Sequence, residues 1–329
     1  MIFGGLILLI GVLALFWFSN FESSPISPQL KTISLLLASD LQLSTIDGIK
    51  IGLDELGWRE DENYRLTLYN PKGDRELTKK LAQDIVAARP DLIVAVSTSA
   101  SRAVEDANEM AQLPVVFVDV GNFEELGIQN IQRPGGFMTG VVVDNVPVAP
   151  KRMEILKTLN PNLKNIGILV NNKHVSYDEI LKVHEDGARK LGLSLIWYQV
   201  TKKEEIAGVM AKLVRDHPDA FMTTSEAVIS GNADLIAPAL KKAKIPSIDF
   251  NIERGIGSGY LMVYGVPRFE TGKQGARIID KVLKGANPGD IPIEFASALN
   301  FEISARLARD MGIEIPESLL QRANKVYNE

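Results

Sequence analysis

The sequence predicts an α/β protein built from two Rossmann-like lobes. Between residues 33 and 265 one pattern recurs: a short apolar run rich in β-branched residues, a polar break, and an amphipathic helical stretch. Near-continuous apolar runs suit strands that are covered on both faces, and the helices between them indicate parallel βαβ units. The chain has 329 residues, which exceeds the usual size of a single domain. Two lobes are therefore expected.

The strand-like runs form two sets of five. The first set covers residues 33–39, 64–70, 91–97, 114–120 and 138–144, and the second covers 166–172, 194–200, 220–225, 246–250 and 260–265. The segment between the sets, 144–150, reads DNVPVAP. Its two prolines cannot join the interior of a sheet, so this segment is predicted to cross from one lobe to the other.

Helical periodicity separates the runs, as in Leu77, Leu81 and Ile85, which are spaced by four residues. After residue 265 the pattern predicts a helix over about 269–284, a short strand over 293–299 and two final helices. We expect residues 31–143 and about 267–295 to form lobe 1. Residues 144–266 and about 296–329 are expected to form lobe 2. Several hinge crossings of this kind permit closure around a ligand.

Composition narrows the class of function. Hydrophobic residues make up 46% of the chain and charged residues 23%, as in ordinary globular proteins, and the net charge is −5. A negative chain is a poor partner for nucleic acid, whose phosphates require a basic face. The sequence has no cysteine and only three histidines, with no metal-ligand spacing and no hydrolase or phosphate-loop motif. We therefore expect no catalytic residue, metal or cofactor.

The first twenty residues predict a membrane segment. Residues 2–18 are uncharged and apolar, and a helix of that length just crosses the hydrocarbon core. Phe16, Trp17 and Phe18 are typical of an interfacial belt. No Lys or Arg precedes the stretch and no clear cleavage pattern follows it, which favours an anchor over a cleaved signal or a buried helix. Residues 21–30 then form a linker. Recovery of the full-length chain in the soluble cytoplasmic fraction would contradict an anchor.

Polar residues end several of the predicted strands, where open parallel sheets hold their ligands. Ser97, Thr98 and Ser99 end the third run, and a helix opens at Ala100. Hydroxyls and free N–H groups at a helix N-terminus suit a carboxylate. Serine and threonine are also common N-caps in any protein, so both interpretations stay open.

Glu226 is the candidate partner for a ligand ammonium, although a glutamate in the first turn of a helix is also stabilised by the helix dipole. The amide of Asn171 can donate and accept, but asparagine at a strand end is common turn chemistry as well. Glu226 and Asn171, together with the hydroxyl side chains of residues 97–99, suit a zwitterion such as an amino acid. Five weaker candidates remain. Four are acids or amides at other strand ends, and the fifth is an aromatic residue that could equally belong to the core. They are Asp40, Asp119, Asn122, Asp249 and Tyr264.

Several longer motifs resemble one family. Residues 53–58 read LDELGW, residues 133–141 read RPGGFMTGV, residues 259–265 read GYLMVYG, and residues 308–323 read ARDMGIEIPESLLQRA. In this order and spacing, over residues 31–327, the chain resembles the ABC-transporter substrate-binding proteins related to aromatic-amino-acid binders. It departs from them after the eighth run, where the usual P-T-D-N is replaced by Thr224-Ser225-Glu226-Ala227.

The resemblance implies a type I periplasmic-binding fold, a clamshell that captures a small solute outside the cytoplasm and passes it to an ABC permease. Two other functions are weighed against this one. The first is a membrane-anchored sensor with the same clamshell, and the second is an α/β enzyme. A permease and an ATPase encoded beside the gene separate importer from sensor, and a turnover assay separates the enzyme.

Overall fold

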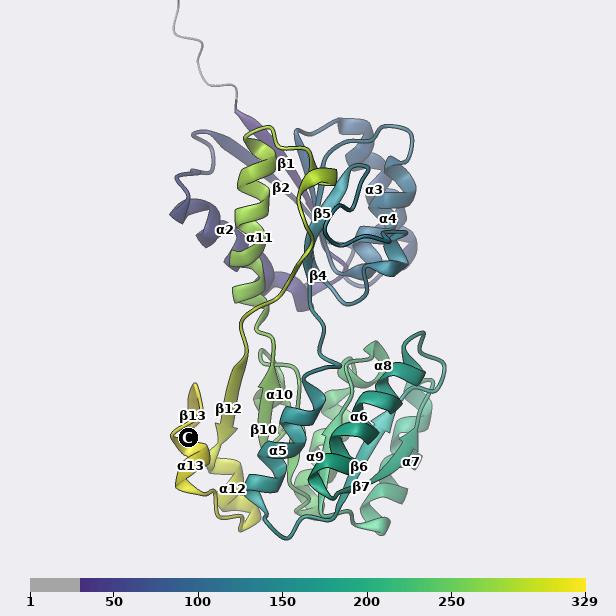
Figure 1. Ribbon diagram of the computed structural model, residues 1–329, viewed down its shortest axis with the longest axis vertical. Helices are drawn as coiled ribbons and strands as arrows, with labels where there is room; N and C mark the ends of the chain where they lie inside the picture. Colours follow the sequence, from purple (N-terminus) through teal and green to yellow (C-terminus); the bar gives the residue numbers. More distant parts are fainter. Residues whose placement is uncertain (1–29) are drawn as a thin grey trace, which may run out of the picture.

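The computed structural model describes residues 30–329 as two α/β lobes, each built on its own sheet (Figure 1). Within residues 30–329 the chain passes between the sheets three times, at residues 143–148, 266–267 and 296–299. The predicted α/β class with two Rossmann-like lobes is confirmed. The predicted anchor over residues 1–20, and the linker up to residue 29, fall outside the described part of the chain.

The first sheet has six strands, all parallel, in the order β11-β5-β4-β3-β1-β2. Helices α2 (Leu43–Glu55) and α11 (Arg268–Leu283) cover one face, and α3 (Arg75–Ala88) and α4 (Thr98–Asn108) cover the other. The strands are β1 (Lys31–Leu36), β2 (Tyr64–Tyr69), β3 (Leu92–Val96), β4 (Val115–Val120), β5 (Met138–Val142) and β11 (Glu294–Phe295).

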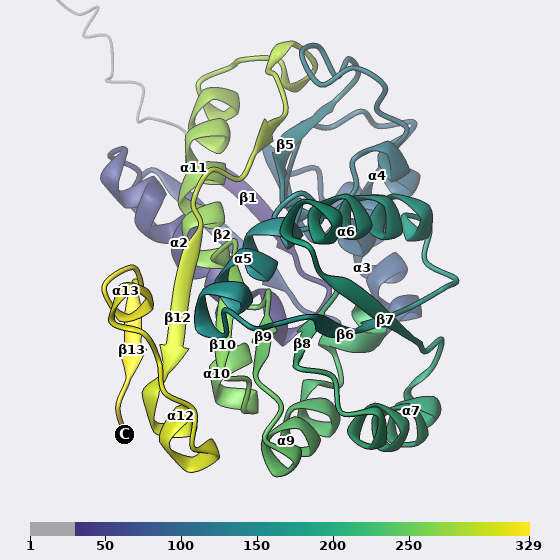
Figure 2. The same ribbon diagram turned by 60° about the horizontal axis from the view of Figure 1, so that its bottom comes forward.

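The second sheet has seven strands in the order β13-β12-β10-β9-β8-β6-β7, which Figure 2 shows side by side from β12 to β7. Only the β10–β12 pair is antiparallel. The strands are β6 (Asn165–Val170), β7 (Ser194–Gln199), β8 (Ala220–Thr223), β9 (Ser247–Asp249), β10 (Met262–Gly265), β12 (Asn300–Ser304) and β13 (Lys325–Tyr327).

Helices cover both faces of the second sheet as well. One face carries α5 (Ala149–Leu159), α6 (Tyr177–Leu191), α12 (Ala305–Met311) and α13 (Glu317–Leu320). The other carries α7 (Lys203–Asp216) and α9 (Ala233–Ala243). Two shorter helices, α8 (Ala227–Ser230) and α10 (Gly255–Ser258), follow the ends of β8 and β9.

The C-terminal strands differ from the expectation. The strand predicted over 293–299 is only two residues long in the first sheet, where Glu294–Phe295 pairs with β5. The chain then leaves that sheet and enters the second one as β12, antiparallel to β10. The expected strand was thus too long, because its second half is a crossing. β12 and β13 had no expected counterpart.

Close contact between two backbones docks α11 on α2 beside the first sheet (Figure 1). Small residues make this approach feasible: Gly48 on α2 lies against the backbone of Phe269 on α11, and Gly52 on α2 lies against Ala276. A Cβ atom at Gly272 would overlap the carbonyl oxygen of Thr45. Since α11 begins directly after the second crossing, this docking also fixes the position of the crossing relative to the first sheet.

Among residues 30–329, no helix combines the length and apolar character needed to span a membrane. The anchor therefore stays a prediction from the sequence.

We expect Gly272→Ala to lower the free energy of unfolding by about 1–3 kcal/mol, because the added methyl group overpacks the α2–α11 contact. Urea denaturation measures this change. Gly208→Ala is the matched control, since Gly208 lies within α7 with open space around its Cβ position. The control should stabilise the protein by about 0.4–1 kcal/mol. Equal stability of Gly272→Ala and the wild type would contradict the proposed packing.

Candidate functional site

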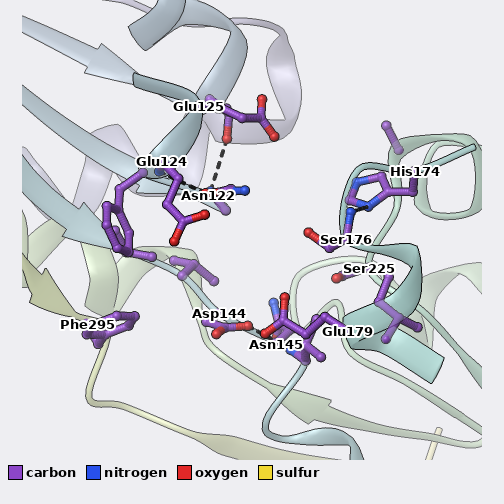
Figure 3. A pocket seen from close by; sticks show the side chains of 18 residues that line it. Asn122, Glu124, Glu125, Asp144, Asn145, His174, Ser176, Glu179, Ser225 and Phe295 are labelled. Atoms are coloured by element: carbon purple, nitrogen blue, oxygen red, sulfur yellow. Dashed lines mark hydrogen bonds between the residues drawn. The ribbon is translucent and has the colours of Figure 1, made fainter. Parts of the chain in front are cut away.

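A cavity of about 370 Å³ lies between the two sheets. Its walls come from the loops after β3, β4 and β5, the loops after β6 and β8, and the start of α6 (Figure 3). These loops leave the carboxyl ends of parallel strands, where open α/β sheets bind ligands. A smaller space of about 180 Å³ continues the cavity and shares part of its lining, namely Thr98, Gly121, Val143, Asn145 and Ser225.

The start of α4 presents free hydrogen-bond donors to this cavity. Ser97 caps the helix, its Oγ accepting from the N–H of Ala100 at 3.3 Å, and Thr98 Oγ1 accepts from the N–H of Gly121 at 3.1 Å. Within the described residues, the N–H groups of Thr98 and Ser99 have no protein acceptor, as expected in a first helical turn. Thr98 and Ser97 line the cavity, whereas the Ser99 side chain is exposed and does not.

Backbone strain occurs at the ends of two neighbouring strands beside this helix. Ser97 has φ = 97° and Asp119 has φ = 59°, in the region that favours glycine. Such a conformation costs about 1–3 kcal/mol per residue and persists where the surroundings impose it, which is common at binding sites. Both strained residues line the smaller part of the cavity.

Arg268 links the two sheets at the same point. Its Nε donates to Asp119 Oδ2 at 3.0 Å, and its Nη1 donates to Glu253 Oε2 at 3.1 Å. Asp119 is the penultimate residue of β4 in the first sheet, whereas Glu253 follows β9 in the second. Although burial lowers the pKa of Arg268, the two carboxylates outweigh that effect and raise it, so the guanidinium stays charged. Sequence reasoning missed this residue, although its place directly after Pro267 marked a crossing.

Glu226 is occupied by protein contacts and does not line the cavity. It is 2% exposed, its Oε1 accepts from the N–H of Asn171 at 2.9 Å, and its Oε2 contacts Thr224 Oγ1. The hydroxyl of Thr224 also donates to the carbonyl of Leu169. Burial raises the pKa of Glu226 from 4.5 to about 7. The carboxyl group thus ties the end of β6 to the start of α8, and Ser225 beside it lines the cavity instead.

The other candidates separate into those at the cavity and those away from it. Asn122 lines the cavity, and its Oδ1 accepts from the N–H of Glu124. Asp249 is buried behind the lining against Thr223. Tyr264 packs edge-to-face on Phe301 in the core, with ring centroids 6.2 Å apart.

Asp40 and Asn171 also lie off the lining. Asp40 is exposed and accepts from Asn70 Nδ2, and the Asn171 side chain accepts from the N–H of Lys173. The structure thus brings four of the ten candidates to the cavity, namely Ser97, Thr98, Asp119 and Asn122.

Sequence reasoning missed several lining residues. Asp144 and Asn145 lie on the first crossing, the DNVPVAP segment that was singled out only for its prolines. Glu179 lies in the first turn of α6, where no strand end marked it. Phe123 and Phe295, with ring centroids 6.4 Å apart, form an aromatic pair in the wall.

The model of the family described as ABC transporter substrate binding protein matches residues 32–327. The chain belongs to this family. A tyrosine-binding protein of Clostridioides difficile (strain R20291) is 25% identical over 242 residues, covering 73% of this chain and 68% of the relative. The family consists of binding proteins, which confirms that the chain is not an enzyme.

Solved structures of binding proteins share the fold of this chain. An ABC domain from Streptococcus pneumonia in complex with L-Trp is 26% identical with a TM-score of 0.79, covering 91% of this substrate-binding protein and 100% of that chain. A ligand-free, open substrate-binding protein from Clostridium difficile is 20% identical with a TM-score of 0.74, at the same coverage. The predicted type I periplasmic-binding fold is confirmed.

Glu226→Gln should change how stability depends on pH. Because the folded-state pKa of Glu226 is raised, its protonation contributes stability that is complete below about pH 4.5 and is lost as pH rises through about 7. Glutamine stays neutral and can donate to Thr224 Oγ1. We expect the melting temperature of the variant, relative to the wild type, to rise by about 3 °C or more between pH 5 and pH 8.

Thermal denaturation at the two pH values checks this expectation. Glu204→Gln is the control, because Glu204 is exposed on α7 and forms no side-chain bond among the described residues. Parallel pH profiles for Glu226→Gln and the wild type would show that the Glu226 carboxyl group titrates normally.

Proposed function

We propose that this substrate-binding protein captures an amino acid between its two sheets and delivers it to an ABC permease at the outer face of the membrane. The cavity lined from both sheets carries this proposal, because a ligand held on both sides favours the closed state over the open one. Three chain crossings of a few residues each can serve as the hinge.

The cavity offers partners for both charges of an amino acid. The free N–H groups of Thr98 and Ser99, at the positive end of the α4 dipole, suit the α-carboxylate. Asp144 and Glu179, which lie beside Asn145 in Figure 3, provide negative charge for the α-ammonium. The aromatic pair Phe123 and Phe295 adds an apolar wall for a side chain.

The relatives support the same class of ligand. The pneumococcal structure holds L-Trp, and the Clostridioides difficile relative is a tyrosine-binding protein. The apolar stretch of residues 2–18 supports attachment to the membrane, which keeps the binding lobes close to a permease.

A thermal-shift screen of amino acids against the purified chain tests the proposal, followed by calorimetry on each positive compound. A ligand at about 100 times its Kd should stabilise the protein by about 2.7 kcal/mol. Ala227→Trp places an indole in the cavity and should weaken binding at least about tenfold. Ala207→Trp, on the exposed face of α7, is the matched control and should bind as the wild type does.

Two outcomes would overturn the proposed site. Retention of wild-type affinity by Ala227→Trp would show that the solute binds elsewhere. Failure of every amino acid to stabilise the wild type would remove amino acids as the ligand class.

A further inference from the structure

Four carboxylates surround the cavity without a cationic partner. Glu124 and Glu125 come from the loop after β4, Asp144 from the first crossing and Glu179 from α6 (Figure 3). Among the described residues none of these four carboxylates forms an ion pair. Exposed Asp and Glu side chains elsewhere in residues 30–329 do pair with lysines. These four residues are termed the acidic wall.

The acidic wall is not neutralised from within the cavity. The larger part of the cavity has no Lys or Arg among the lining residues that the structure describes, and Arg268, which lines the smaller part, is already paired with Asp119 and Glu253. His174 also lines the cavity, but burial lowers its pKa despite the opposing charge of Glu125, and its Nδ1 accepts from the N–H of Ser176. Its imidazole is therefore mainly neutral at pH 7. The negative charge is left for a ligand to balance.

Local structure accounts for only part of this charge. Glu179 lies in the first turn of α6, where the helix dipole favours an acid without any ligand. Asp144 lies in no helix, and the N–H of Val146 is its only hydrogen-bond donor among the described residues. A half-buried carboxylate with one donor at the base of an interlobe cavity has no such explanation.

Asn145 provides an independent indication of a ligand. Its side chain is only 9% exposed and lines both parts of the cavity, yet its Oδ1 has no donor within the described residues. Buried amide oxygens in proteins almost always accept a hydrogen bond. Because the amide can turn by 180°, its oxygen can face the cavity and accept from a ligand N–H group.

We propose that the captured solute carries a net positive charge, with one cationic group balanced by Asp144 and Glu179 beside the Asn145 amide and a second facing Glu124 and Glu125. This inference rests on the proposed amino-acid function and specifies the class as amino acids with a basic side chain. A neutral zwitterion has one ammonium and leaves part of the acidic wall unbalanced. Closure of the lobes would then bury carboxylates without a partner, which disfavours the closed state.

Calorimetry with shape-matched pairs tests the charge. L-Arginine is compared with L-citrulline, and L-lysine with L-norleucine, on the purified chain at low salt. We expect the basic member of at least one pair to bind about tenfold tighter or more, with the advantage falling as salt is raised. Glu124→Gln and Glu125→Gln should each reduce the arginine-to-citrulline affinity ratio at least about fivefold, because they face the side-chain cation that only arginine has. Glu179→Gln and Asp144→Asn face the α-ammonium that both ligands share, so they should weaken arginine and citrulline alike.

Glu185→Gln is the matched control, because Glu185 is exposed on α6 and does not line the cavity. It should leave the ratio unchanged, and circular dichroism confirms that each variant is folded. A neutral amino acid that binds as tightly as its basic counterpart, or a ratio that no wall variant alters, would overturn the charge assignment and leave amino-acid capture intact. Absence of binding by every amino acid, charged or neutral, would overturn both.

Discussion

The relative position of the two lobes depends on a buried guanidinium. Arg268 is the first residue of α11, and it donates to Asp119 at the end of the first sheet and to Glu253 at the end of the second. Loss of this side chain would leave Asp119, with a 10% exposed side chain, as a buried charge without its partner. Breaking a buried ion pair in this way costs about 3–5 kcal/mol. The glycine-mediated docking of α11 on α2 fixes where the guanidinium lies.

A second buried guanidinium binds the backbone near two of the crossings. Arg152 is 1% exposed and donates to the carbonyls of Asn145 and Tyr264. Asn145 lies on the first crossing, and Tyr264 lies just before the second. Burial lowers its pKa to about 10, so it remains charged at neutral pH. The floor of the cavity, including Asp144 and Asn145, is therefore held by charge-assisted bonds, which are stronger than neutral ones. Crossings held in this way suit a protein whose lobes close on a ligand.

Much of the fold could be predicted from the sequence because burial on both faces leaves a plain pattern. Most of the runs that became β1 to β10 are apolar over most of their length, although the edge strand β2 reads YRLTLY and is partly exposed. Helix α11 was expected within one residue of its observed bounds. The end of the chain was harder, because β11 and β12 belong to different sheets and the crossing between them carries no pattern of its own. β13 is a three-residue strand that gains its order from pairing with β12.

The candidate site was only partly predictable, because strand ends can be read from a sequence but side-chain directions cannot. Thr98 and Asn122 follow strands and reach the cavity, whereas Glu226 turns inward to bond to Asn171. The positive φ of Ser97 is set by its surroundings and not by its residue type. Arg268 and Glu179 reach the site from the first turns of α11 and α6, and their positions follow only from the packing of both lobes.

Hydrogen–deuterium exchange with and without the solute found by calorimetry tests most directly whether the two lobes share one ligand. Capture between the sheets predicts slower exchange at residues 97–100 and 121–125 of the first lobe and, at the same solute concentration, at residues 174–180 and 225–228 of the second. The surface of α7, which lies away from the cavity, should exchange at an unchanged rate. Slower exchange in the segments of one lobe alone, or in none of these segments, would contradict capture between the two sheets.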